Sequence, residues 1–195
     1  MSTPASMSMS TPYPRDRLDP YSLIPFDDQL LDQAVEAAQH SPRKRHIIRL
    51  HEHEEAVQRM LNAIEPESYA RPHRHADRPE TLVAMRGSVL VARFADDGTP
   101  VEGVVASAAG PVRGVEIPPG AWHGVIALQH GSVVFEVTLG PYDPATHKEF
   151  ADWAPPEQDR QAGLEYIARL RAQFEVVLPK LAAIDQIEAE EDEIC

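Results

Sequence analysis

Short apolar runs separated by turn residues occupy the middle of the chain, between about residues 68 and 139. The runs have strand length, and Gly, Pro and Asp residues interrupt them. Asp97-Gly98, placed between two apolar runs, is typical of a hairpin turn. The predicted strands span residues 68–75, 81–94, 101–106, 114–118, 124–128 and 132–139. Because no helical pattern alternates with these strands, the sequence predicts an all-β sandwich or barrel.

Two stretches before this region have helical spacing. In the first, apolar residues recur three and four positions apart between residues 31 and 38, and Asp27 or Asp28 can cap the helix. In the second, residues 54–64, the apolar positions fall at i, i+3, i+4 and i+7. These positions are Val57, Met60, Leu61 and Ile64. We therefore expect a helical segment over residues 25–66 that packs on the barrel.

The two ends of the chain differ from its middle. Residues 1–24 are rich in Ser, Thr, Pro and Met without apolar periodicity, so we expect them to be disordered. Residues 158–195 begin with an amphipathic helical pattern and end in an acidic tail. The apolar seam of this helix is narrow enough for helix pairing, so packing on its own barrel and formation of a homodimer are both open. The region between, residues 67–157, is the predicted barrel with a closing loop.

Composition excludes several classes of partner. The chain has 195 residues, of which 43% are hydrophobic, enough for one domain with a real core. Its net charge of −13 argues against nucleic acid as a partner, since a phosphate backbone requires a basic face. No apolar run is long enough to cross a membrane, and the N-terminus lacks the apolar stretch of a signal peptide. With Cys195 as the only cysteine, we expect no internal disulfide and a cytoplasmic location.

One stretch carries the spacing of a metal site. His73 and His75 are two residues apart, so in a strand both imidazoles point to the same face. Glu80 follows a short turn and begins the next apolar run, and His123 follows the turn at residues 118–120. Three imidazoles and one carboxylate suit zinc, iron, manganese, nickel or copper rather than calcium or magnesium. Such His/Glu sites on strands often leave coordination positions open to water or substrate.

The same spacing resembles the two-part motif of the cupin superfamily. The motif residues are His73, His75, Glu80, Gly87, Pro118, Gly120 and His123. Over residues 41–157 the chain further resembles the WbuC-type cupin-fold metalloproteins, small bacterial proteins named from gene clusters for polysaccharide O-antigen. The resemblance implies a cupin jelly-roll β-barrel and a bound divalent transition metal. It implies little about the reaction.

Several other residues are candidates for binding or catalysis. Glu136 is an acid within a strand, and it could serve either as a general acid/base near the metal or as the partner of an arginine. Tyr142 lies in the long loop 140–157, which could carry binding groups or wrap the barrel as packing. Arg43 and Arg45 belong to a basic cluster that is either a solvated charge run or an anion-binding lip.

Strand periodicity suggests which arginines face the barrel interior. If His73 and His75 point inward, so should Arg71, and the count from Glu80 places Arg86 inward as well. A buried arginine needs an anionic partner, so each is either part of an internal ion pair or a clamp for a substrate. We expect an internal pair for Arg86 and keep Arg71 as a candidate substrate-binding residue.

The function expected from the resemblance is that of a metal-dependent enzyme, similar to an isomerase or epimerase. Its substrate would be a small carbohydrate or nucleotide sugar, neutral or anionic, in cell-surface polysaccharide metabolism. One alternative is a non-catalytic sugar-binding or sensing cupin, in which the ion only organises the pocket. A further alternative is an iron-dependent dioxygenase, since the same ligand set with iron can activate dioxygen.

Overall fold

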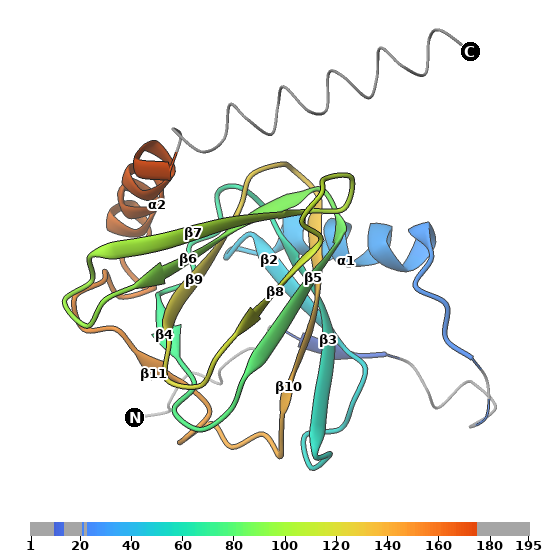
Figure 1. Cartoon of the computed structure of the whole chain (residues 1–195). Coiled ribbons are helices and arrows are strands. Elements are labelled where there is room, and N and C mark those ends of the chain that lie inside the picture. Colours follow the sequence, from blue (N-terminus) through green and yellow to red (C-terminus); the bar gives the residue numbers. More distant parts are fainter. Residues whose placement is uncertain (1–9, 14–20, 22, 175–195) are drawn as a thin grey trace, which may run out of the picture.

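The computed structural model describes residues 10–13, 21 and 23–174 (Figure 1). Its elements are β1 (Ser10–Pro12), α1 (Asp28–His40), β2 (Arg45–Arg49), β3 (Val57–Ile64), β4 (His73–Arg74), β5 (Glu80–Arg86), β6 (Ser88–Phe94), β7 (Pro100–Ser107), β8 (Gly114–Ile117), β9 (Trp122–Ala127), β10 (Ser132–Leu139), β11 (Glu149–Phe150) and α2 (Arg160–Phe174). Most of the segment expected to be disordered, residues 1–24, lies outside the described residues. So do the acidic tail and the end of the C-terminal helix.

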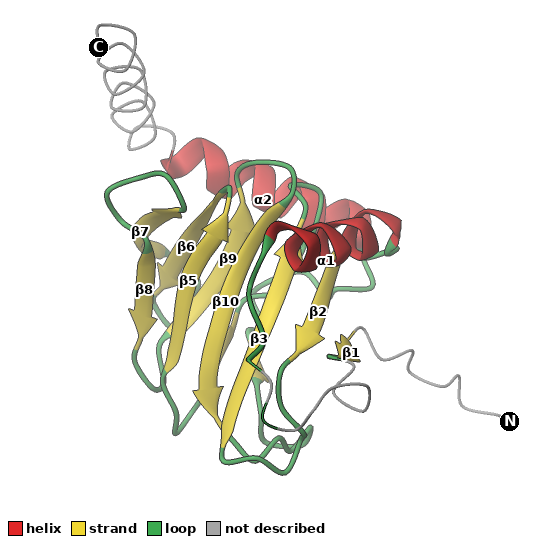
Figure 2. Cartoon of the chain, turned by 90° about the vertical axis from the view of Figure 1, so that its right-hand side faces the viewer, coloured by secondary structure: helices red, strands yellow, loops and turns green. Residues whose placement is uncertain are grey.

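The strands form two facing sheets, as expected for a cupin jelly roll. One sheet has the order β1-β2-β3-β10-β5-β8, and the other has the order β11-β4-β9-β6-β7. Apart from the parallel pair of β1 and β2, the paired strands are antiparallel. Figure 2 shows the larger sheet from outside, with α1 lying across it. The prediction of an all-β core with a jelly-roll barrel is confirmed.

Gly87 divides the stretch that the sequence predicted as one strand, residues 81–94. The chain turns there with a φ of 63°, a conformation that favours glycine, and passes from β5 in the larger sheet to β6 in the smaller one. A Cβ atom at this position would lie 2.6 Å from the Ser132 hydroxyl oxygen. The turn therefore needs glycine for both its backbone angle and its close packing.

The helix predicted over residues 54–64 is wrong, because this segment contains strand β3. β3 lies between β2 and β10 and is covered on both faces. Leu61 packs toward α1, whereas Met60 and Ile64 face the barrel interior. Val57 and Leu61 therefore share one face of the strand, and Met60 and Ile64 share the other. A strand buried on both sides thus reproduces the apolar spacing of a helix.

The two helices cover the outer faces of the sheets. α1 begins at the N-cap Asp27, whose side chain accepts a hydrogen bond from the Leu30 N–H at 3.0 Å, and its buried face packs on the larger sheet. α2 packs on the smaller sheet through Ile167 and Leu170. The Arg171 guanidinium ties α2 to the barrel by donating to the backbone carbonyl of Ala127 at 2.8 Å. The described part of the C-terminal helix thus packs on its own barrel.

Arg86 does not form the interior ion pair that strand periodicity predicted. Its guanidinium instead donates to Asp32 and Asp28 on α1, at 2.6 and 3.1 Å. The register between β5 and β10 shifts between Val133 and Val134. This irregularity adds one residue to β5 and turns Arg86 to the helix-covered face.

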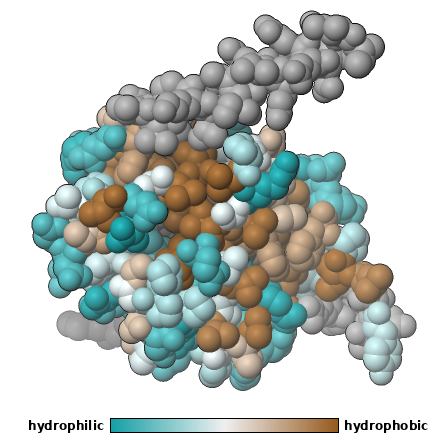
Figure 3. Space-filling model, viewed as in Figure 1, coloured by the Kyte–Doolittle hydropathy of each residue, from teal (hydrophilic) through white to brown (hydrophobic). Residues whose placement is uncertain are grey.

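In the described part of the chain, β8 is an edge strand of the larger sheet and β7 is an edge strand of the smaller sheet. Figure 3 shows apolar side chains gathered over this region, and Val101 of β7 is 48% exposed. The homodimer stays a prediction.

Within the described residues, neither helix is long and apolar enough to cross a membrane.

The two-sided burial of β3 predicts an unequal response to truncation along the strand. Leu61→Ala should lower the free energy of unfolding by about 2–5 kcal/mol, because Leu61 is fully buried between α1 and the sheet. Val57→Ala is the matched control; Val57 is 42% exposed, and its truncation should cost less than about 1 kcal/mol. Urea unfolding of both variants measures the difference, and equal losses would contradict the packing described here.

Candidate metal centre and its pocket

Four buried side chains converge at one end of the barrel, where the two sheets meet. His73 on β4 pairs directly with His123 on β9, and His75 follows one residue after β4. Glu80 is the first residue of β5 and comes from the opposite sheet. One ligand atom from each of His73, His75, Glu80 and His123 lies within 4.8 Å of all the others. The spacing that suggested a metal site thus places these four residues together in the fold.

Backbone carbonyls orient all three imidazole rings. The Nδ1 atoms of His73, His75 and His123 lie 3.2, 2.6 and 2.9 Å from the carbonyl oxygens of Arg71, His147 and Ala121. An Nδ1–H donating to each carbonyl leaves the Nε2 lone pair free. The Nε2 atoms of His73 and His75 are buried and have no hydrogen-bond partner among the described residues. This arrangement is typical of histidines that bind a metal through Nε2.

The electrostatics of the cluster favour a bound cation. Burial holds the pKa of His73 well below its ordinary value, so its imidazole is neutral. Burial raises the pKa of Glu80, but contacts with His123 and His75 outweigh it and hold the pKa well below the ordinary range. The Glu80 Oε2 atom lies 3.0 Å from the Nε2 of His123 and 3.5 Å from that of His75. A proton shared between Glu80 and one histidine can bridge only that one contact, whereas a divalent cation can be coordinated by all four side chains. The group could therefore hold a zinc, iron, manganese or nickel ion.

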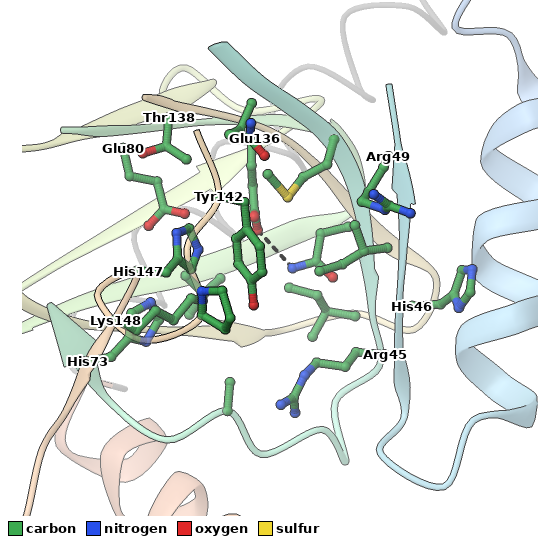
Figure 4. A pocket seen from close by; sticks show the side chains of 18 of the residues that line it. Arg45, His46, Arg49, His73, Glu80, Glu136, Thr138, Tyr142, His147 and Lys148 are labelled. Carbon is green, nitrogen blue, oxygen red and sulfur yellow. Dashed lines mark hydrogen bonds between the residues drawn. The ribbon is translucent and has the colours of Figure 1, made fainter. Parts of the chain in front are cut away.

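A cavity of about 500 Å³ opens beside this cluster (Figure 4). Its walls come from β2, β3 and β10 and from the loop that leads to β11. Among its lining residues are the metal-site residues His73 and Glu80 and the candidates Arg43, Arg45, Arg71, Glu136 and Tyr142. All five candidates singled out for binding or catalysis thus line one cavity.

Glu136 points into this cavity from the inner face of β10. It is only 8% exposed, and the Asn62 amide on β3 donates to its carboxyl at 2.8 Å, the contact drawn as a dashed line in Figure 4. Burial, together with the nearby charge of Glu80, raises the pKa of Glu136 to about 7. A carboxyl with this pKa can both release and accept a proton near neutral pH.

The three candidate arginines all have partners within the protein. The Arg45 guanidinium donates to Glu157 at 2.8 Å and to the Tyr69 carbonyl at 2.6 Å, and Arg43 also pairs with Glu157. Arg71 donates to the Ala151 carbonyl at 2.8 Å. These contacts hold the segment after β11 against the cavity rim. The same arginines still line the cavity, so an anionic ligand could share them.

The loop between β10 and β11 is attached to the metal centre. The His147 backbone carbonyl accepts from His75, and the His147 ring lies 5.0 Å from the His75 ring. Tyr142, 37% exposed, packs between the rings of His53 and His147 at 4.8 and 4.7 Å. The loop therefore packs on the barrel and also lines the cavity.

Sequence reasoning missed some residues of this cavity. Asn62 lies in the stretch predicted as a helix, so the sequence did not predict that it pairs with β10. Once β3 is known to be a strand, its register with β10 places Asn62 on the inner face near Glu136. His51 and His53 repeat the His-x-His spacing but are not part of the cluster. The Nδ1 atom of His51 lies 2.6 Å from the Arg59 carbonyl oxygen and 2.9 Å from the Arg59 backbone nitrogen.

Comparison with known proteins gives a partial family match and distant structural similarity. The family described as a domain of unknown function, DUF6016, matches residues 26–106, less than half of the chain. No curated protein matches the sequence. The resemblance to WbuC-type proteins stays a prediction.

Three solved structures illustrate the structural similarity. The capsular polysaccharide assembling protein CapF of Staphylococcus aureus is 17% identical with a TM-score of 0.49, over 56% of this chain and 32% of that one. An oxalate oxidase in complex with glycolate is 17% identical with a TM-score of 0.44, over 57% of each chain. KdgF from Halomonas sp. is 20% identical with a TM-score of 0.39, over 52% of this chain and 80% of that one. The chain thus matches about a third of the length of CapF.

Removal of a ligand from the cluster should abolish tight metal binding. We expect His75→Ala and Glu80→Ala each to weaken the affinity for zinc or manganese by about 100-fold or more, because three donors remain in place of four. Calorimetric titration of the metal into chelator-treated protein measures this, with circular dichroism to verify folding. His40→Ala is the control, since this exposed histidine at the end of α1 lies outside both the cluster and the cavity and should leave the affinity unchanged.

The raised pKa of Glu136 predicts a dependence of stability on pH in the metal-free protein. The folded state retains a proton that the unfolded state has lost, so stability falls as pH rises from about 4.5 to about 7. This component amounts to about 3 kcal/mol. Glu136→Gln should remove it, because the amide resembles the protonated carboxyl. Urea unfolding between pH 5 and 8 measures both proteins, and parallel profiles would contradict the raised pKa.

Proposed function

We propose that this metal-binding cupin is an enzyme similar to an isomerase or epimerase, acting on a small carbohydrate or nucleotide sugar. One observation carries the proposal: a single cavity combines the His/Glu cluster, a carboxyl with a pKa near 7 and several guanidinium groups. A purely structural ion would need neither the cavity nor a titratable acid beside it. The context of cell-surface polysaccharide metabolism is part of the proposal and comes from the resemblance of residues 41–157 to WbuC-type proteins.

Each part of the cavity has a role in this proposal. A divalent ion held by the His/Glu cluster would polarise a carbonyl or chelate adjacent oxygens of the ligand. Glu136 removes a proton from carbon and returns it, and Asn62 positions its carboxyl for this step. Tyr142 is a second proton donor at the cavity rim. Arg43, Arg45 and Arg71 bind polar groups of the ligand at the cavity rim, where they also pair with Glu157 and the Ala151 carbonyl.

A non-catalytic sugar-binding or sensing protein is the alternative. The Asn62 contact favours it, because an acid that already has an internal partner can be a purely structural group. An iron-dependent dioxygenase is a further alternative with the same ligand set, and consumption of dioxygen would distinguish it. A cytoplasmic location and a homodimer stay predictions.

Exchange of a carbon-bound proton with solvent tests the proposed chemistry. We expect the metal-loaded protein to exchange deuterium from D2O into at least one member of a panel of hexoses, hexuronates, hexose phosphates and nucleotide-diphosphate sugars. Glu136→Gln should slow this exchange by about 100-fold or more while changing ligand affinity only a few-fold. Proton NMR follows the exchange, and calorimetry measures the affinity.

Glu102→Gln is the matched control, because this exposed glutamate on β7 lies outside the cavity. It should exchange at the wild-type rate. If wild-type protein binds a sugar but exchanges no proton, the non-catalytic alternative is correct. If exchange continues at full rate in Glu136→Gln, the acid/base role of Glu136 is wrong.

A further inference from the structure

The arginines that line the cavity differ in whether the protein already supplies their charge with a partner. Arg43 and Arg45 share the carboxylate of Glu157, and Arg71 donates to a backbone carbonyl. Arg49 also lines the cavity, but the structure gives its guanidinium no hydrogen bond or ion pair with a described residue. Its Nε atom is buried without a partner. Arg49 is therefore the arginine of this cavity whose charge still needs an acceptor.

The register of β2 explains why Arg49 faces the cavity. Arg49 pairs with Met60, and Met60 pairs with Glu136 on the next strand. Met60 faces the interior, so Arg49 and Glu136 lie on the same inner face, in one row across three strands. In contrast, Ile48 beside Arg49 packs toward α1. Strand pairing thus directs the Arg49 side chain into the cavity. The outer face of the sheet at Ile48 is covered by α1.

The same register gives the separation between Arg49 and the acid. Neighbouring strands lie about 4.8 Å apart, so two steps from β2 to β10 place the backbones of Arg49 and Glu136 about 10 Å apart. Glu80 lies one strand further, because Thr138 of β10 pairs with Glu80 of β5. In Figure 4, Arg49 and the His73 side chain lie at opposite sides of the cavity. A ligand that contacts both Arg49 and the His/Glu cluster therefore has about the length of a sugar ring with one substituent.

The charges of the cavity favour an anion at the Arg49 end. A guanidinium that is partly removed from water is costly unless an acceptor compensates for it. The nearest acid along the row, Glu136, is held by Asn62 and has a pKa of about 7, so it carries only part of a negative charge at neutral pH. The planar fork of a guanidinium matches the two oxygens of a carboxylate or phosphate. The described residues thus leave an oxyanion site open at this end.

We propose that Arg49 binds a carboxylate or phosphate group of the ligand and thereby selects an anionic sugar over a neutral one. This inference rests on the proposed function, because it assigns the substrate class of the same cavity. It places the ligand with its oxyanion at Arg49 and its reacting carbon beside Glu136. Oxygens at the opposite end of the ligand then face the His/Glu cluster.

The experiment compares anionic and neutral sugars in the metal-loaded, full-length protein. Glucuronate, glucose 6-phosphate and glucose are titrated calorimetrically at constant ionic strength into wild type and Arg49→Gln. We expect Arg49→Gln to weaken binding of the anionic sugars by about 10- to 100-fold and to leave glucose affinity unchanged. Loss for glucuronate alone identifies a carboxylate site, and loss for glucose 6-phosphate alone identifies a phosphate site. Arg93→Gln is the control, since Arg93 forms an exposed ion pair with Glu102 on another strand.

A second titration separates this inference from the proposed function. Acetate and sulfate are added to wild type, and NMR follows the arginine Nε–H resonance that is missing from Arg49→Gln. A saturable shift of this resonance, without binding of any sugar, supports the anion site and overturns the carbohydrate proposal. Equal affinity of wild type and Arg49→Gln for the anionic sugars overturns the role of Arg49. Absence of both sugar binding and the shift overturns both.

Discussion

The structure depends on how the protein holds four electron-rich atoms close together in a buried place. Three imidazole nitrogens and a carboxylate oxygen meet at one end of the barrel, and backbone carbonyls fix the histidine rings through Nδ1. Such a group is unfavourable without a cation, because the acceptors repel one another and have lost their contact with water. The features around it, from strand pairing to the loop before β11, keep these atoms in place. A site so arranged favours a divalent transition metal.

The jelly roll supplies this rigidity by dividing its interior into two halves. One half is an apolar core between the sheets, with Leu82, Val89 and Val134 among its buried members. The other half carries the cluster and the cavity. Because both sheets contribute ligands, the packing of the apolar half sets the distance between Glu80 and the histidines. Stability of the fold and geometry of the site are thus properties of the same sheet packing.

The sequence predicted which four side chains meet in the cluster and most of the strands, but not the contacts that these side chains and the cavity residues make. The ligand spacing was informative because strand periodicity and two turns fix it locally, so the chain itself carried the signal. Residues 57–64 were misassigned because a strand covered on both faces has apolar residues at helical intervals. The partners of Arg43 and Arg45 could not be predicted either, since Glu157 is more than a hundred positions away. The pKa of Glu136 likewise depends on burial and on Asn62 from another strand, which only the folded chain defines.

The most direct test of the metal centre is anomalous X-ray diffraction from crystals of protein purified without a histidine tag or added metal. We predict one strong anomalous peak, at about 2.0–2.2 Å from the ligand atoms of the cluster, whose absorption edge identifies the element. The peak should lie among His73, His75, Glu80 and His123. A folded protein that shows no anomalous peak there, even after soaking with zinc, manganese, iron and nickel, would contradict the account. The cavity would then bind its ligand through hydrogen bonds and ion pairs alone.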